Sequence, residues 1–204
     1  MEKSQENYII FPGESDRPDL LVSLYLKNYG DHFAKGRRNL DDGSFLLSLE
    51  NFRQFLKFLI NGKGVFDGLG RNLSHNECRL ILNGIIGNSY PIRGEFLNQV
   101  FSYQVNSWQT IYNDINKGET LIKKIDIPAS KYLGIHQWLN NATSCGLPQK
   151  DSSLLEELLY KQPTGFGDKG TIFYSNSFCA NLDCSVADGF SHPGIGFRPV
   201  KIKK

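Results

Sequence analysis

The chain has 204 residues, and 40% of them are hydrophobic, which is enough for one domain with a real core. Its 23 lysines and arginines almost balance its 21 acidic residues, so the formal net charge of +2 excludes a bulk attraction to nucleic acid or to a membrane surface. Four scattered cysteines are too few for a disulfide framework, and no apolar run reaches the ~20 residues of a membrane span. We therefore expect a single domain, 1–204, without membrane insertion, nucleic-acid binding or an export signal.

The N-terminal part of the chain predicts strands. Residues 1–7 form a polar tail, and Tyr8–Phe11 is an apolar run closed by a Pro-Gly turn pair, which is typical of a strand. The apolar run 20–26 fits a strand or a helix, and its pattern does not separate the two.

Two helices are predicted next. Apolar residues recur at three- and four-residue steps over 45–60, and Gly62 follows, which indicates an amphipathic helix that faces the core. Ser74 and Glu77 have the spacing of a capping box, so a second helix should begin there and run to about Asn83.

The middle of the chain is rich in β-forming residues. Residues 99–127 alternate between polar and apolar and predict strands joined by a turn at 113–119. A further helix should begin at a Ser130 cap and end before Gly146 at its C′ position, and the apolar patch 154–160 is also helical in pattern. Helices followed by strands predict an α+β fold with mixed, mostly antiparallel sheets and flanking helices.

The segment 170–200 has an unusual composition. It contains no Lys, Glu, Gln, Met or Trp, although all five occur upstream. Every residue in it can be encoded by a codon that ends in a pyrimidine, and repeated replacement of the first two letters of asparagine codons would leave such a set. The composition by itself leaves two explanations open, which are diversification of the segment and chance.

The end of this segment, Ile195–Val200, resembles the last strand of the formylglycine-generating branch of the C-type-lectin fold. Variable proteins of diversity-generating retroelements share this ending, and in them an A-N-L-D-C-like strand precedes it, here Ala180–Cys184. Two further pieces, Tyr90–Leu97 and Gln137–Pro148, are similar to archaeal and archaeal-virus relatives.

The resemblance implies a C-type-lectin-like fold in which the N- and C-terminal strands pair, here 8–11 with 197–202. Residues 8–169 would be a scaffold, and 170–200 a hypervariable ligand-binding segment with the closing strand. Such a chain would be a non-enzymatic receptor-recognition protein in a virion or the cytoplasm, a monomer rather than a homo-oligomer. It would hold a protein or surface ligand without a cofactor.

Alternation divides the segment into two faces. Ala180, Leu182 and Cys184 are small or apolar at every second position, so we expect them to face the core while their neighbours face outward. The expected ligand-binding residues are Tyr174, Ser175, Asn176, Ser177, Phe178, Asn181, Asp183, Ser185, Val186, Ala187, Asp188, Phe190, Ser191 and His192.

Aromatic residues in such a surface supply contact area at low entropic cost. Tyr174, Phe178 and Phe190 are the expected anchors of a bound ligand. In the alternative interpretation, Phe173, Tyr174 and Phe178 are core aromatics and the remainder is an ordinary polar loop.

A copper-dependent oxidase of the formylglycine-generating type is the enzymatic alternative. Cys179 and Cys184 have the four-residue gap of the copper(I)-binding cysteines in that family, and soft thiolates suit copper(I). The lead-in at 173–177 departs from the family pattern. A structural virion or assembly subunit is a third possibility.

Other metal sites have little support in the sequence. The four histidines are far apart and lack the spacing of zinc ligands, and no lectin-type calcium motif is present.

Overall fold

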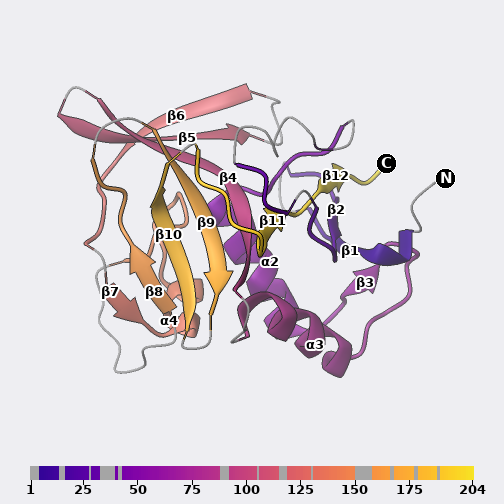
Figure 1. Ribbon diagram of the computed structural model, residues 1–204. Coiled ribbons are helices and arrows are strands. Elements are labelled where there is room, and N and C mark those ends of the chain that lie inside the picture. Colours follow the sequence, from indigo (N-terminus) through magenta and orange to yellow (C-terminus); the bar gives the residue numbers. More distant parts are fainter. Residues whose placement is uncertain are drawn as a thin grey trace.

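The computed structural model has an α+β fold made of two mostly antiparallel sheets and a few helices (Figure 1). It describes residues 5–13, 17–27, 29–32, 40, 43–87, 92–104, 106–114, 119–129, 131–149, 158–165, 168–176, 179–187 and 189–204. The α+β class predicted from the sequence is confirmed.

The small sheet contains both ends of the described chain. Its strands are β1 (Tyr8–Phe11), β2 (Leu20–Ser23), β3 (Phe66–Asp67) and β12 (Val200–Ile202), in the order β12-β2-β1-β3. A 3₁₀ turn, Gln5–Asn7, precedes β1.

The large sheet has the order β6-β5-β4-β9-β10-β8-β7, and β11 lies parallel to the first half of β4. Its strands are β4 (Arg93–Gln104), β5 (Ser107–Asp114), β6 (Glu119–Ile125), β7 (Lys131–Leu133), β8 (Leu158–Lys161), β9 (Lys169–Ser175), β10 (Ala180–Val186) and β11 (Ile195–Phe197).

The helices are α2 (Leu49–Asn61), α3 (His75–Ile86) and α4 (Ile135–Asn140), and α2 lies between the two sheets (Figure 1). On one side Phe55 of α2 packs edge-on against Phe11 of the small sheet, with ring centroids 5.6 Å apart. On the other side Phe52 contacts Phe173 of the large sheet at 5.1 Å. The apolar stripe predicted over 45–60 therefore joins both sheets into one core.

Local sequence signals set the helix ends. Ser48 caps α2, where its hydroxyl accepts from the backbone N–H of Asn51, and Gly62 ends the helix with φ of 61°. Ser74 and Glu77 form the predicted capping box: the Ser74 hydroxyl accepts from the Glu77 N–H, and the Glu77 carboxylate accepts from the Ser74 N–H. The Glu77 carboxylate accepts from the Ser74 N–H, from Arg71 and from the Ser74 hydroxyl, and these three hydrogen bonds lower the pKa of Glu77 to about 2.

Of two other predicted helices, one is present but shorter than expected, and the described end of the other is a strand. The chain is a strand before Gly134, so α4 spans Ile135–Asn140 alone, and the predicted Ser130 cap lies outside the described residues. Gly146 has the positive φ of a helix C′ residue, 85°, but lies in a later turn where its carbonyl accepts from the Trp138 indole. Of the patch 154–160, the described end belongs to β8, where pairing with β10 overrides the helical pattern.

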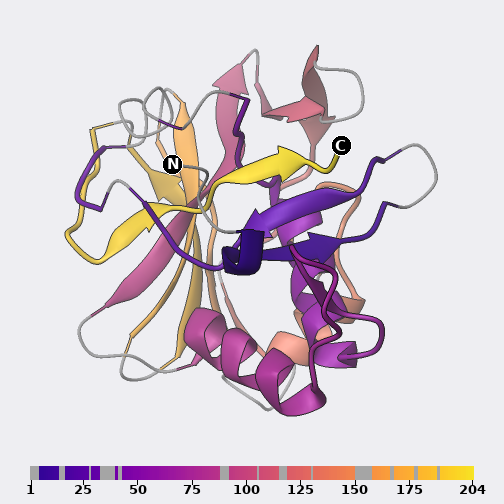
Figure 2. The ribbon, with the colours of Figure 1, turned by 90° about the vertical axis from the view of Figure 1, so that its right-hand side faces the viewer.

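The pairing of the terminal strands differs from the expected one. β12 pairs with β2, Val200 opposite Val22, and β2 lies between β12 and β1. Figure 2 shows the yellow β12 beside the indigo strands of the small sheet. The ambiguous run 20–26 supplies this intervening strand, and both ends of the chain still share one sheet.

The closing motif, Ile195–Val200, has three central residues, and each of them has a structural role. A side chain at Gly196 would approach the Lys27 carbonyl to 2.8 Å, so only glycine fits without a shift. The Phe197 ring stacks on Phe96 at 4.7 Å. The Arg198 guanidinium is buried, donates to both carboxylate oxygens of Glu95 at 2.9–3.0 Å, and donates to the Ser23 carbonyl at 2.7 Å.

The two faces of the large sheet bury different cores. The face toward α2 contributes Phe173, Leu182 and Cys184 to the larger core. The opposite face holds a small second core: Leu46, Phe96, Ile172, Val186, Ile195 and Phe197. The inward positions predicted for 180, 182 and 184 are confirmed, since all three side chains are at most 2% exposed.

Arg198→Met should destabilise the fold strongly, because it leaves the Glu95 carboxylate buried without its cation. We expect a loss of about 3–5 kcal/mol in the free energy of unfolding, measured by urea denaturation. The control Lys203→Met removes the exposed pair with Asp19 and should cost about 0–1 kcal/mol. Equal losses in the two variants would contradict a structural role for the buried pair.

Candidate functional site

A hollow of about 530 Å³ lies over β8, β9 and β10 on the face of the large sheet that points away from α2. Its volume falls within the range of small-ligand sites, about 300–1,000 Å³. Its lining includes half of the residues expected to bind a ligand: Tyr174, Asp183, Ser185, Val186, Ala187, Phe190 and His192. The other lining residues are Ile92, Lys161, Ile172 and Ile195.

Strand register creates the floor of the hollow. Asp183 of β10 lies opposite Ile172 of β9 on one side and Lys161 of β8 on the other. Cross-strand partners point to the same face of a sheet, so these three side chains form one outward row. The next row, centred on Leu182, points into the larger core.

The polar side chains of the floor are connected by hydrogen bonds. The Lys161 ammonium lies 3.3 Å from the Asp183 carboxylate and donates to the Tyr174 hydroxyl at 3.5 Å. The other Asp183 oxygen accepts from the backbone N–H and the hydroxyl of Ser185, at 2.9 and 2.6 Å. Asp183 is thus held in one position by two neighbours.

The charge state of Lys161 follows from the same contacts. Burial by itself lowers the pKa of Lys161, but the Asp183 carboxylate and the Tyr174 hydroxyl together raise this pKa above its ordinary value. Because this pKa is raised, the charged Lys161 side chain stabilises the folded state at neutral pH. This stabilisation is lost as the pH rises through the pKa that Lys161 has in the folded protein.

The loop before β11 forms the wall of the hollow. The Phe190 ring packs edge-on against Phe96, with centroids 6.4 Å apart, and remains 36% exposed. His192 accepts from the Gly194 N–H at 3.1 Å through Nδ1, and its carbonyl accepts from the Ile195 N–H. The wall therefore extends the small second core while leaving aromatic surface accessible.

Close backbone approach allows the wall to sit against the sheet. A side chain at Gly94 would meet the Tyr174 Cβ at 2.3 Å, and one at Gly194 would meet the Ile92 carbonyl oxygen at 1.8 Å. Only glycine lets β4 pass directly under Tyr174.

Outward exposure was wrongly predicted for three of the expected residues. Ser175 is 1% exposed because it lies two residues after Phe173 in β9 and so points to the same, core-facing side. Asn181 is 2% exposed, and its amide donates to the Cys179 carbonyl. Val186 is 6% exposed because a register shift after Asp183 turns it into the second core.

The remaining expected residues divide into two groups. Asn176 is half-buried in the turn after β9, and Ser191 is exposed beside the hollow without lining it. Ser177, Phe178 and Asp188 lie outside the described residues, so the role of Phe178 as an anchor stays a prediction. Phe173 is a core residue, whereas Tyr174 is only half-buried.

Sequence reasoning missed Lys161. The residue follows an apolar patch that was assigned to a helix, and its partner Asp183 is 22 residues away. Assigning 158–161 to a strand would have placed Lys161 on the outward face. The parallel pairing of this strand with β10 joins residues that are distant in sequence, so no local pattern indicates it.

The cysteines of the copper alternative do not meet. Cys179 lies in the turn before β10, and Ala180 to Cys184 spans about 13 Å of strand at about 3.3 Å per residue. With metal–sulfur bonds of about 2.3 Å, the two thiolates are too far apart to share one ion. Burial also raises the pKa of the Cys184 thiol well above its ordinary value, which disfavours the thiolate.

Comparison of the chain with protein-family models, with curated proteins and with solved structures finds no match. Within the described ranges, no group of three or more His, Cys, Asp or Glu side chains is arranged to hold a metal ion. Of the helices described, none is long and apolar enough to cross a membrane.

Asp183→Asn should lower the pKa of Lys161 relative to the parent, because it removes the carboxylate that raises it. The measurement is an NMR titration of the lysine side-chain carbons. Ser191→Ala, an exposed neighbour outside the hollow, is the control and should leave the titration unchanged. A Lys161 pKa that is the same in Asp183→Asn and the parent would contradict the contact.

Proposed function

We propose that this chain is a non-enzymatic ligand-binding protein, a variable protein of a diversity-generating retroelement. It displays a hypervariable surface on a C-type-lectin-like scaffold. The ligand is a protein or another surface molecule of a virus's host or of a cell, and recognition proceeds without a catalytic step or a cofactor.

The supporting observation is that the compositionally unusual segment and the hollow coincide. Eight lining residues of the hollow fall within 170–194, and buried residues such as Phe173, Leu182 and Cys184 lie between them in the same segment. A diversified surface needs this arrangement, because its positions must accept many side chains over a core that stays constant.

The fold proposal rests on the closing motif and on the position of the termini. Both ends of the chain share the small sheet, and the last two strands bridge the small and the large sheet. A C-type-lectin-like assignment is compatible with this topology and with the resemblance of Ile195–Val200.

The hollow suggests how a ligand would be held. Phe190 and Tyr174 offer aromatic contact area, and neither is fully buried. Asp183 and Lys161 offer opposite charges on the floor, 3.3 Å apart, so the site can match polar groups of either sign. Recognition by shape with aromatic anchors and adaptable polar contacts is the mode expected of a surface that changes its target.

The proposal is tested at the DNA level. We expect a near-identical template repeat of the 3′ end of the gene beside a reverse-transcriptase gene, differing from it only at template adenines. Differences should concentrate in the codons of exposed and half-buried residues such as Asp183, Ser185 and Phe190.

The buried positions of the same segment are the internal control. The codons of Leu182, Cys184 and Phe197 should match the template or encode only apolar replacements. Differences spread evenly over outward and inward codons would contradict the proposal, and the lack of any repeat would favour a structural subunit.

A further inference from the structure

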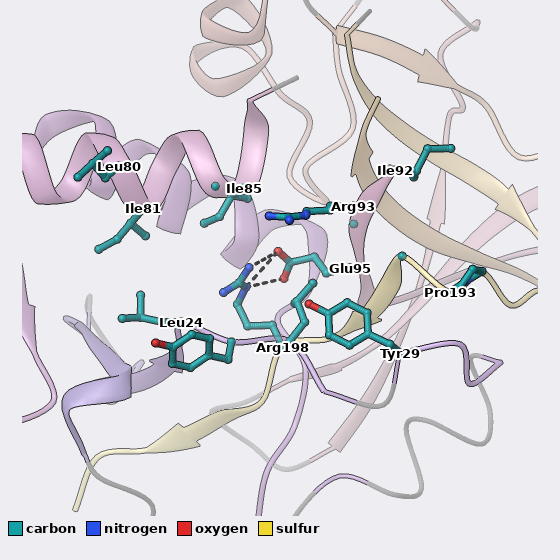
Figure 3. Close-up of a pocket in the computed structure, with 15 residues that line it drawn as sticks. Leu24, Tyr29, Leu80, Ile81, Ile85, Ile92, Arg93, Glu95, Pro193 and Arg198 are labelled. Carbon is teal, nitrogen blue, oxygen red and sulfur yellow. Dashed lines mark hydrogen bonds and ion pairs between the residues drawn. The ribbon is translucent and has the colours of Figure 1, made fainter. Parts of the chain in front are cut away.

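A second concave site lies on the other side of the start of β4. This groove has a volume of about 780 Å³ and runs between α3, the segment after β2 and the turn before β11 (Figure 3). Of the residues that line the hollow over β10, only Ile92 also lines the groove. The groove is therefore a separate site, and a ligand bound there is independent of the proposed function.

The walls of the groove are apolar or aromatic: Leu24, Tyr25, Tyr29, Leu80, Ile81 and Ile85. Three of these are unusually exposed for large side chains, Tyr25 by 63%, Tyr29 by 54% and Leu80 by 71%. Single exposed apolar residues are normal on a protein surface, but a concave cluster of them marks a binding site.

A glycine in the last turn of α3 leaves open space in the groove. Gly84 belongs to α3, and a Cβ placed on it would have no atom within 4 Å. The open space beside Gly84 is therefore part of the groove.

The floor of the groove is electrically neutral. Glu95 and Arg198 lie there, 4% and 7% exposed, and form the buried ion pair that joins β4 to the closing motif. Figure 3 shows the hydrogen bonds between the two side chains. Each charge is satisfied by the other, so the pair leaves no net charge for a ligand.

One cation in the groove is unpaired. Arg93 is exposed at the start of β4, and none of the residues that the structure describes forms an ion pair or hydrogen bond with its side chain. Figure 3 shows it reaching from β4 over the Glu95–Arg198 pair toward Ile85 of α3. The lining of the groove therefore has a net charge of one, positive, at the edge of an apolar wall.

We propose that this groove binds a small monocarboxylic acid with an apolar body. The body lies between the α3 wall and the two tyrosines, in the space left by Gly84, and the carboxylate pairs with the Arg93 guanidinium. A carboxylate matches the two parallel N–H donors of arginine and balances a single positive charge, whereas a phosphate dianion would leave an excess negative charge.

The test measures binding of phenylbutyrate to the full chain by calorimetry. The parent should bind it, and phenylbutanol, which has the same body without the charge, should bind at least about tenfold more weakly. Phenylbutylamine, with the opposite charge, should not bind.

Two variants test charge and space separately. Arg93→Gln should weaken phenylbutyrate binding at least about tenfold with no change for phenylbutanol. Gly84→Leu should abolish binding of both, because the leucine fills the groove, while its helix propensity maintains α3. Arg79→Gln, an exposed arginine of α3 outside the groove, is the control and should bind like the parent. Urea denaturation verifies that each variant is folded.

Three results would overturn the proposal. The first is a parent that does not bind phenylbutyrate. The second is binding that survives both Arg93→Gln and Gly84→Leu. The third is a parent dimer that Gly84→Leu converts to a monomer, which would assign the groove to a second copy of the chain.

Discussion

The buried ion pair between Arg198 and Glu95 joins three parts of the fold that are far apart in sequence. Arg198 precedes the last strand, Glu95 lies in the central strand β4, and the Ser23 carbonyl that also accepts from Arg198 ends β2. A buried charge that loses its partner costs several kcal/mol, so the pair determines where the closing strands can lie. The loop that walls the hollow and the floor of the groove both depend on this position.

The two faces of the large sheet have different surroundings. Its inner face belongs to the larger core with α2, whereas its outer face is covered only where the small second core extends. The hollow lies where that cover ends, with Asp183 and Lys161 on the floor. Substitutions on the outer face change the surface of the hollow without removing contacts from the larger core. The proposed diversified surface requires this property.

Features set by neighbouring residues were predictable from the sequence, and features set by distant pairing were not. The α2 stripe and the Ser74 capping box depend on contacts within a few residues, so their patterns were sufficient. Alternation predicted the buried face of β10, but the burial of Asn181 depends on its own amide contact and on flanking strands. The partner of Arg198 is 103 residues away, and no local pattern indicates it.

The division of 170–200 into a constant inner face and a variable outer face is the central claim, and one substitution scan tests it most directly. Every residue of the segment is replaced by all others, and folded variants are recovered by their resistance to protease. The account predicts broad tolerance at Asp183, Ser185, Ala187 and Phe190 and narrow, apolar tolerance at Phe173, Leu182 and Cys184. Equal tolerance on both faces, or intolerance at the outer positions, would contradict it.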